Sequence, residues 1–449
     1  MDRGLVVSKS VDLLIKSGRV VSPGGITQFD IGIANGKIVT LGNLSGVSAA
    51  NVIDAKNLHV LPGVIDSQVH FREPGLEHKE DIEHGTRSAI KGGVTSIFEM
   101  PNTSPLTLDE DTLSQKLEIA GRTAWCDFAF FMGGNSENAH QLAELERLPG
   151  CAGVKIFMGS STGTLLAKDD EVIAMVLANG TRRVSVHAED EDRLLSRQGI
   201  AVSAETVGAH PDWRDVESAV RATKRIIQLA RDANRRVHVL HISSKDEMDI
   251  LANHKDLITV EVTLNHLSLV APDCYEDLGA FSQMNPPVRD ISHQNGLWEA
   301  IQNGIVDVIG SDHAPHTIEE KERPYPSSPS GMPGVQTSLP LLLDHVNQGR
   351  LTLERVVDLT SAGPQRIFGI MGKGRIAVGY DADLVLVDLN ADRVITNDWI
   401  ESKCGWTPFN DTKVRGWPII TILRGEIAMQ DDEILGEPVG AAVRFFETA

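Results

Sequence analysis

Three short apolar stretches decide the fold: GVKIFMG at residues 153–159, RVSVHAE at residues 183–189 and RVHVLHI at residues 236–242. Each is rich in Val, Ile or Phe and has the length of one strand. Nearly continuous apolar runs indicate strands that are buried on both faces, as in a parallel sheet. The runs carry Lys155, His187 and His241, and the polar residues cluster toward the C-terminal ends of the predicted strands.

Five more runs of the same kind complete a set of eight between residues 64 and 313. They are VIDSQVHF from Val64, VTSIFEM from Val94, DFAFFMG from Asp127, ITVEVTL from Ile258 and VDVIGSDH from Val306. Segments with apolar residues at helical spacing lie between them, such as residues 80–93 and 217–234. Eight strands that alternate with helices predict an α/β fold of the (β/α)8 barrel type, whose active sites lie at the C-terminal ends of the strands.

The two ends of the chain carry a different pattern. VDLLIKSGRVV, DIGIANGKIVTLG, GRIAVGYDADLVLVDL and TILRGEIAMQ are short strand-like runs between Gly-containing turns, without helices. We therefore expect a small β-sandwich built from residues 1–60 and 375–449 around a barrel of residues 61–374. In the C-terminal part, Trp399, Trp406 and Trp417 either anchor the tail on the barrel or line an interface. The Pro- and Ser-rich residues 321–336 form a loop over the barrel mouth, as a pocket wall or a lid.

Composition and charge exclude several classes of protein. The 449 residues are 41% hydrophobic and carry a formal net charge of -20 with no basic patch, which argues against binding to nucleic acid or to an anionic membrane surface. No apolar run reaches 18 residues, and the first 21 residues do not resemble a secretion signal. Four widely spaced cysteines fit a reducing compartment, so we expect a cytoplasmic protein with a small-molecule substrate.

The predicted rim of the barrel brings together groups that bind metals. His70, His187, His241 and Asp312 follow four different strands at the same end, and neutral imidazole and carboxylate groups are ligands for Zn²⁺ and related ions. Lys155 lies in the fourth run. It is either a lysine that extends out of the barrel or a buried amine with a lowered pKa, which can react with carbon dioxide to form a carbamate.

Six strings in this chain resemble the dihydroorotase branch of the cyclic amidohydrolases. They are DSQVHFREPGLEHKED, EMPNTSPLT, GVKIFMGSSTG, VHAED, VHVLHIS and GSDHAPHT, and the resemblance extends over essentially the whole chain, including the divided β-sandwich. It implies one or two zinc ions, with His70 on the first metal, His187 and His241 on the second, and an N6-carboxylated Lys155 between them. Asp312 would contact the first metal and act as the general base.

The resemblance also implies how the substrate is held. Arg72, Asn102 and His316 match positions that bind the substrate carboxylate, and Asn285 and the Gly331 region match the pocket wall that hydrogen-bonds the pyrimidine ring. Without the resemblance, Arg72 is a residue of a surface salt bridge and Asn102 is a turn former.

One residue departs from the family pattern. Where the family shows two histidines in an HxH pair after the first strand, this chain has Gln68, Val69 and His70. A Gln carbonyl is a weaker zinc ligand than imidazole, so we expect the first metal to bind less tightly or with different coordination.

The implied function is the metal-dependent, reversible opening of dihydroorotate to N-carbamoyl-L-aspartate in pyrimidine biosynthesis. Two alternatives are another cyclic amidohydrolase, such as an allantoinase or a dihydropyrimidinase (hydantoinase), and a non-catalytic homologue that scaffolds aspartate transcarbamoylase. We expect a homo-oligomer, a dimer or a tetramer, that associates with aspartate transcarbamoylase if the scaffold alternative applies.

Overall fold

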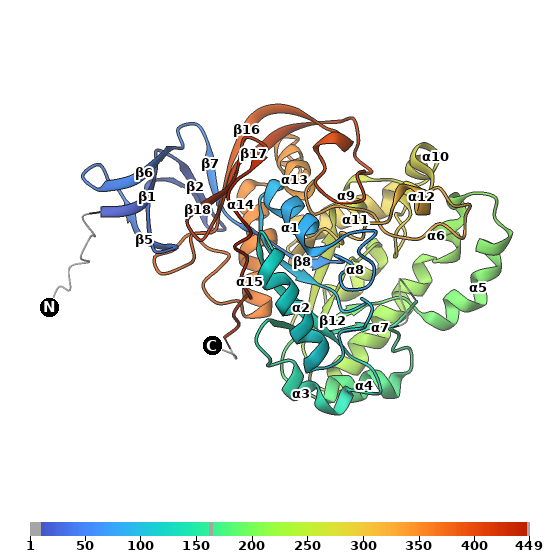
Figure 1. The fold of residues 1–449 in the computed structure, drawn as a ribbon. Helices are drawn as coiled ribbons and strands as arrows, with labels where there is room; N and C mark the ends of the chain where they lie inside the picture. The colour runs from blue at the N-terminus through green and yellow to red at the C-terminus, as the bar shows by residue number, and fades with distance from the viewer. Residues whose placement is uncertain (1–9, 161–164, 447–449) are drawn as a thin grey trace.

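A computed structural model describes residues 10–160 and 165–446. Figure 1 shows two parts: a barrel surrounded by helices and a smaller all-β part in which the first strands of the chain lie beside the last ones. Strands β16 (Leu384–Ile395) and β17 (Thr412–Leu423) extend from the all-β part over the barrel. The fold class predicted from the sequence, a (β/α)8 barrel with a β-sandwich built from both termini, is confirmed.

All eight predicted barrel strands are present, and each pairs in parallel with the next along the chain. They are β8 (Val64–Val69), β9 (Val94–Glu99), β10 (Asp127–Gly133), β11 (Cys151–Phe157), β12 (Val184–His187), β13 (Val237–Val239), β14 (Ile258–Thr263) and β15 (Val308–Gly310). The described residues of every strand are fully buried, which explains why each reads as a continuous apolar run. A bridge between Val69 and His313 joins the last strand to the first.

Helices cover the outside of the barrel and form part of its mouth (Figure 1). They are α1 (Ile82–Lys91), α2 (Glu110–Thr123), α3 (Leu142–Leu145), α4 (Asp170–Ala178), α5 (Glu191–Ser203), α6 (His210–Trp213), α7 (Val216–Asp232), α8 (Lys245–Leu251), α9 (Leu264–Ser268), α10 (Asp273–Leu278), α11 (Ile291–Gln302), α12 (Ile318–Lys321), α13 (Ser338–Asn347), α14 (Leu353–Val357) and α15 (Gly363–Phe368). The two helices expected from apolar spacing are α1 and α7. Both begin after an aspartate, Asp81 or Asp215, whose side chain accepts a hydrogen bond from a backbone N–H of the first turn.

Two sheets form the sandwich. One has the order β5-β4-β1-β6 and the other β19-β18-β17-β16-β7-β2-β3. Their remaining strands are β1 (Ser10–Lys16), β2 (Arg19–Ser22), β3 (Gly25–Gln28), β4 (Asp30–Ala34), β5 (Lys37–Gly42), β6 (Ser48–Asp54), β7 (His59–Pro62), β18 (Glu426–Gln430) and β19 (Glu433–Ile434). Successive side chains of strand β16 point to opposite faces and so pack in two different cores. Leu384 and Leu386 pack inside the sandwich, whereas Val385 and Val387 pack in the large barrel core. One face of this strand therefore packs inside the sandwich and the other packs against the barrel.

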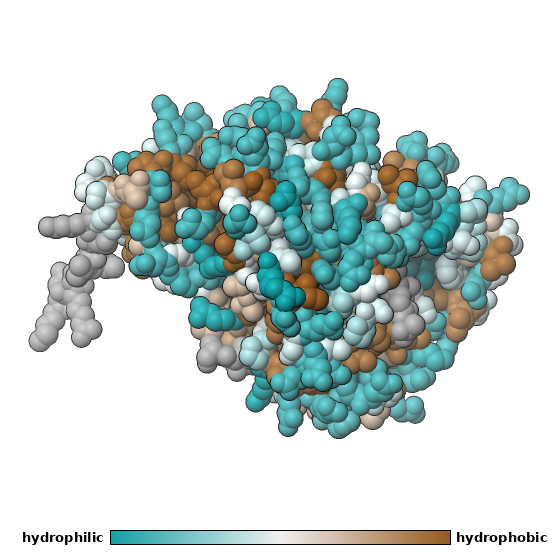
Figure 2. All heavy atoms as spheres, in the orientation of Figure 1, coloured by the Kyte–Doolittle hydropathy of each residue, from teal (hydrophilic) through white to brown (hydrophobic). Residues whose placement is uncertain are grey.

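Apolar side chains gather on the surface of the sandwich in Figure 2, and the barrel face of that view is mostly hydrophilic. Within residues 10–160 and 165–446, none of the helices combines the length and the apolar character that crossing a membrane requires.

A buried cluster of charges joins the sandwich to the bottom of the barrel. Lys373 Nζ lies 2.7 Å from Asp383 Oδ2 and 3.3 Å from Asp381 Oδ2, and it also contacts Asp127 at the start of β10. Arg424 binds the other oxygen of Asp127. Burial by itself would lower the pKa of Lys373, but the three carboxylates outweigh burial and raise it above its usual value.

We predict that Lys373→Met lowers the free energy of unfolding by about 3–5 kcal/mol, because it leaves buried carboxylates without their cation. Urea unfolding followed by tryptophan fluorescence measures the change. Lys37→Met is the matched control: Lys37 also pairs with Asp381, but its side chain is 37% exposed, so its loss should cost less than about 1 kcal/mol. Equal losses in the two variants would contradict the role of burial.

Candidate active site

The predicted metal-binding residues meet at the C-terminal rim of the barrel. His70 directly follows β8, Lys155 lies near the end of β11 and His187 is the last residue of β12. His241 and Asp312 each lie two residues beyond the end of a strand, β13 and β15. All five side chains are buried. Because parallel strands end at one edge, the barrel brings into one site residues that are far apart in the sequence.

His70 and Asp312 form the first group of contacts. His70 Nδ1 lies 2.8 Å from Asn102 Oδ1, and a carbonyl oxygen can only accept, so His70 donates from Nδ1. Burial lowers the pKa of His70, which keeps the ring neutral and leaves a lone pair on Nε2. That nitrogen lies 3.2 Å from Asp312 Oδ1. Two acceptors that face each other at this distance favour a cation between them.

Gln68 lies beside the same carboxylate. Its Nε2 donates to Asp312 Oδ1 over 3.1 Å, and its Oε1 is buried without a hydrogen-bond partner among the described residues. The amide nitrogen has no lone pair for a metal, so Oε1 is the atom of this side chain that can act as a ligand. The orientation of the amide thus makes Gln68 a donor that holds Asp312 as well as a candidate ligand.

His187 and His241 form the second group. His187 Nδ1 and His241 Nε2 are 2.9 Å apart, and their rings meet edge to face. His187 Nε2 lies 2.9 Å from Glu189 Oε2 and donates to it, so the lone pair of the neutral ring is on Nδ1. Burial lowers the pKa of both imidazoles. Two neutral ring nitrogens directed at one point are a suitable pair of metal ligands.

Glu189 is a functional residue that the sequence analysis did not single out. It accepts from His187 and pairs with Arg214. Although burial opposes ionisation, Arg214 and His187 hold the pKa of the Glu189 carboxyl well below its usual range. Such a carboxylate orients a metal-binding histidine and makes it more basic. The sequence signal for this role is the i, i+2 spacing of His187 and Glu189 at the end of the strand, because residues at that spacing lie on the same face.

Lys155 is buried to 99% of its surface, so the alternative in which it extends out of the barrel is wrong. Its Nζ lies over the ring of Phe157, 4.4 Å from the centroid. Burial lowers the pKa of Lys155 to about 7, while Asp312 and Glu261 act in the opposite direction. Part of the amine is therefore neutral near neutral pH. The end of its signature string, residues 161–163, lies outside the described residues.

Three predicted site residues have a left-handed backbone. The φ angles are 67° at Arg72, 38° at His241 and 47° at Asp312. This region is unfavourable for residues with a Cβ and is maintained only where the surrounding structure imposes it. The strain lies where side chains must leave the strand direction to enter the barrel mouth.

Arg72 is 3% exposed, so the surface salt bridge considered from the sequence is wrong. Its Nε donates to Pro315 O over 3.2 Å and its NH2 group lies 3.3 Å from His316 Nε2. Among residues 10–160 and 165–446, no carboxylate forms a direct ion pair with this guanidinium within 4.0 Å, although the charges of Asp312, Glu99, Glu320 and Glu80 favour its charged form. Burial lowers its pKa to about 10, which still leaves it charged. Within the described residues, the site thus holds a buried cation that has carboxylates nearby but no direct ion pair with any of them.

The predicted pocket wall is ordered around Lys321. Its buried Nζ donates to the backbone oxygens of Gln283, Pro329 and Gly331. Gly331 has φ +143°, and a Cβ there would lie 2.3 Å from Ala314 O, so this position requires glycine. Residues 321–336 therefore have the structure of a pocket wall.

Asn285 lies on the opposite side of this wall. Its Oδ1 accepts from His210 Nε2 over 2.9 Å. A cavity of about 320 Å³ opens beside it, between α5, α6 and residues 326–330, and reaches Ser160 after β11. Asn285 thus lines a cavity, although none of the five predicted metal-binding residues at the rim lines it.

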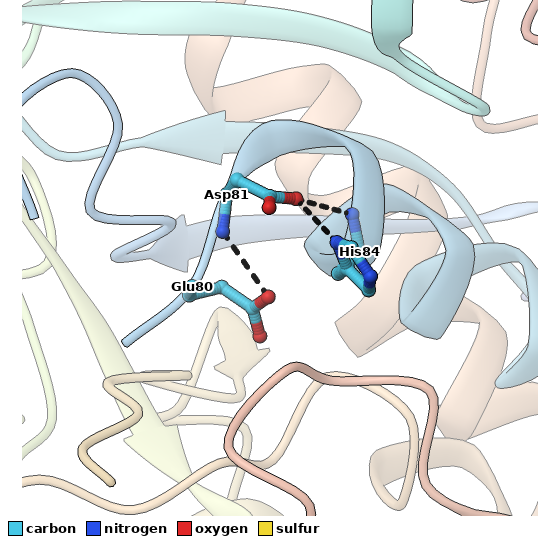
Figure 3. Close-up of side chains that lie close together, drawn as sticks. All are labelled: Glu80, Asp81 and His84. Carbon is cyan, nitrogen blue, oxygen red and sulfur yellow. Dashed lines mark hydrogen bonds and ion pairs between the residues drawn. The ribbon is translucent and has the colours of Figure 1, made fainter. Parts of the chain in front are cut away.

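A second cluster, Glu80, Asp81 and His84, has the geometry of a small cation site (Figure 3). Its oxygens already have donors. Asp81 Oδ1 accepts from the N–H and the ring of His84 and thereby caps α1, and Asp81 Oδ2 pairs with Lys403. Glu80 accepts from Ser402 and from His313 Nε2. We interpret this cluster as a helix cap and an anchor for residues 402–403.

The barrel and its rim define the class of metal-dependent barrel hydrolases. A family model described as "Amidohydrolase family" matches residues 59–428. The dihydroorotase of Pyrococcus abyssi is 37% identical over 96% of this chain and 98% of its own, and that of Methanosarcina acetivorans is 36% identical over 95% and 94%. The solved L-hydantoinase (dihydropyrimidinase) of Arthrobacter aurescens matches with a TM-score of 0.92 at 31% identity, over 97% of this chain and 100% of its own. This chain belongs to the amidohydrolase family, and the resemblance found in the sequence is confirmed.

We predict that His84→Ala leaves the metal content of the purified protein unchanged and destabilises it by less than about 1 kcal/mol. The reason is that the backbone N–H of residue 84 still caps onto Asp81, while the lost side chain is partly exposed. Elemental analysis and a thermal melt give the two values. Loss of one equivalent of bound metal would show that the cluster is a cation site after all.

Proposed function

We propose that this amidohydrolase is a dihydroorotase, which opens the ring of dihydroorotate to N-carbamoyl-L-aspartate in pyrimidine biosynthesis. The observation that carries the proposal is Arg72, a buried guanidinium that makes no direct ion pair with a carboxylate in the part of the chain that the structure describes. An unpaired buried cation is costly, and a substrate carboxylate would compensate it by charge-assisted hydrogen bonds. Two relatives that are 37% and 36% identical over nearly the whole chain are named dihydroorotases, which agrees with this assignment.

The alternative is another cyclic amidohydrolase, an allantoinase or a dihydropyrimidinase (hydantoinase). Because the fold is similar to that of the L-hydantoinase structure, the experiment below also tests this alternative. Dihydrouracil and hydantoin have no carboxylate that could pair with Arg72. Substrate charge therefore distinguishes the two assignments.

We predict that dihydroorotate exceeds dihydrouracil and hydantoin in kcat/KM, and that Arg72→Met lowers kcat/KM for dihydroorotate by at least about a hundredfold. The residual rates on the uncharged rings should change little, because they never used the guanidinium. Steady-state kinetics on the three substrates provide the measurement. Equal rates on charged and uncharged rings in the wild type would transfer the assignment to the hydantoinase group.

The residues at the rim fit a metal centre. The lone pair of His70 faces the Asp312 carboxylate, and that of His187 faces a ring nitrogen of His241. In the part of the chain that the structure describes, His241 Nδ1 and Gln68 Oε1 are buried without hydrogen-bond partners. We propose one or two Zn²⁺ ions: the first held by His70, Asp312 and Gln68, the second by His187 and His241, with a carboxylated Lys155 shared by both. Bound zinc would acidify water and polarise the substrate carbonyl.

The burial of Lys155 supports the proposed carboxylation. The neutral amine attacks the carbon of CO₂, an N–C bond forms as one C=O π pair moves to oxygen, and the nitrogen releases one proton to solvent water, which gives a carbamate with two oxygen ligands. The lowered pKa supplies the neutral amine at ordinary pH. The modification converts a buried cation into an anion beside the neutral imidazoles.

We predict a carbamate signal in the ¹³C NMR spectrum of the protein supplied with labelled bicarbonate, and its absence from Lys155→Ala. The same variant should lose bound metal by elemental analysis, because the shared ligand is gone. Lys321→Ala is the control, since Lys321 is also buried and its pKa is also lowered to about 7, but it binds backbone oxygens away from the imidazoles. A fully active protein with an unmodified Lys155 would remove the carbamate from the proposal.

Asp312 is the proposed general base and acid. It accepts a proton from the water that attacks the ring carbonyl, the ring C–N bond breaks, and the same proton passes to the departing nitrogen. The donor Gln68 Nε2 and the strained backbone at residue 312 fix the carboxylate in this place. Arg72 and His316 would orient the substrate carboxylate, and Asn102 would orient His70 in addition to its predicted contact with the substrate.

We predict that Asp312→Asn lowers kcat by about 10²–10⁴-fold, because an amide cannot accept the proton. The fold should persist, since the side chain keeps its size and one oxygen. A thermal melt within a few degrees of the wild type, together with metal analysis, controls for loss of structure. Substantial turnover by a folded, metal-loaded variant would exclude Asp312 as the base.

A non-catalytic scaffold is the remaining alternative from the sequence. It does not explain why the imidazoles, the lysine and the carboxylate are buried together at the rim. Assembly into a dimer or tetramer, association with aspartate transcarbamoylase and a cytoplasmic location stay predictions.

A further inference from the structure

Residues 396–411, the connection between β16 and β17, form a segment of the sandwich that lies on the barrel mouth. We call it the bridging segment. In Figure 1 this red connection descends toward the barrel from the ends of the two long strands. Its Glu401 pairs with Arg87 and Lys91 of α1, and Lys403 pairs with Asp81 at the start of that helix. The segment is therefore fixed to α1 by charge.

The bridging segment also reaches both ends of the stretch from Asp312 to His316. At one end, Ser402 Oγ and the backbone N–H of Lys403 donate to Glu80, which accepts from His313 as well. At the other end, Trp406 Nε1 donates to the backbone oxygen of His316 over 2.8 Å. The stretch that carries the proposed general base and the proposed carboxylate site is thus held from outside the barrel.

Trp406 is itself rigidly placed. It is 2% exposed, its ring meets Phe281 edge to face with centroids 4.9 Å apart, and Lys321 Nζ lies 5.8 Å from its centroid. A ring fixed on two sides directs its N–H to one place. The hydrogen bond to His316 is therefore a fixed support for the backbone of residues 315–316.

The backbone of residues 315–316 holds the side chain of Arg72. Arg72 Nε donates to Pro315 O, and its NH2 group lies beside the His316 ring, which in turn contacts Ser330 O. A planar guanidinium recognises a carboxylate through two parallel hydrogen bonds, so its orientation decides affinity. A shift of residues 315–316 would rotate the guanidinium away from its partner.

We propose that Trp406 is a positioning residue for substrate binding: its indole N–H fixes the Pro315–His316 backbone and thereby orients Arg72 toward the substrate carboxylate. The inference rests on the proposed function, and it makes the sandwich part of the specificity for a carboxylated ring. Trp406 contacts the backbone of the recognition site, whereas the rim residues contact the reacting atoms in the proposed mechanism. Its loss should therefore weaken binding rather than slow the chemical steps.

The test compares Trp406→Phe with Trp417→Phe. Phenylalanine keeps an aromatic ring at either position and removes the N–H together with part of the indole volume, a loss of volume that both variants share. Trp417 is the matched control because it is also 2% exposed and donates one indole hydrogen bond, 3.0 Å to Asp432 Oδ1, away from the site. Steady-state kinetics on dihydroorotate give KM and kcat separately, hydantoin serves as an uncharged ring, and thermal melts report stability.

We expect Trp406→Phe to raise KM for dihydroorotate by about fivefold or more, the usual effect of one lost hydrogen bond, with kcat within about twofold. Trp417→Phe should lower the melting temperature to a similar extent and leave KM unchanged. The residual rate on hydantoin should be the same in both variants and the wild type. Trp406→Met, which fills the site flexibly without a donor, should repeat the KM effect if the phenylalanine variant is insoluble.

An unchanged KM in a folded Trp406→Phe, or the same KM increase in Trp417→Phe, would overturn the positioning role and leave the proposed function intact. A kcat loss without a KM change would overturn it too, because the residue would then act on the chemistry. A wild-type enzyme, loaded with zinc, that opens hydantoin but no dihydroorotate would overturn both proposals.

Discussion

The backbone hydrogen bond from His70 N to His313 O, 2.7 Å long, closes the barrel between its first and last strands. The contacts at the rim between the first and last barrel strands depend on this hydrogen bond. It sets His70 beside Asp312, and it sets Arg72, two residues after His70, beside His316, three residues after His313. The two parts of the proposed chemistry, proton transfer and carboxylate recognition, thus lie side by side because strands β8 and β15 are neighbours only when the barrel is closed.

Burial supplies the chemistry of the site. In water, the imidazoles would be partly protonated at mildly acidic pH, the lysine would be an ammonium ion and the guanidinium would be solvated. Inside the rim, desolvation lowers the pKa of His70, His187 and Lys155, while Arg72 stays charged. Neutral metal ligands, a reactive amine and an unpaired cation are thus present together, although the chain carries a net charge of -20.

The sandwich does more than tie the two termini together. Its central strand β16 contributes alternate residues to two cores, and Lys373 locks it to the bottom of the barrel. From the same sheet, the bridging segment reaches the top of the barrel, where Trp406 holds His316. The sandwich therefore contacts the barrel at both ends, and a change in it reaches the site through a backbone hydrogen bond.

The sequence by itself determined the eight strands, the sandwich and the residues gathered at the rim, because continuous apolar runs and their polar ends report local burial and strand direction. It did not determine the partners. Glu189 beside His187, Asn102 on the ring of His70, the amide of Gln68 turned toward Asp312 and Trp406 on His316 are contacts set by how loops and strands far apart in the chain pack against one another. Only the tertiary structure fixes such distances, since no local pattern encodes which distant group will satisfy a buried donor or acceptor.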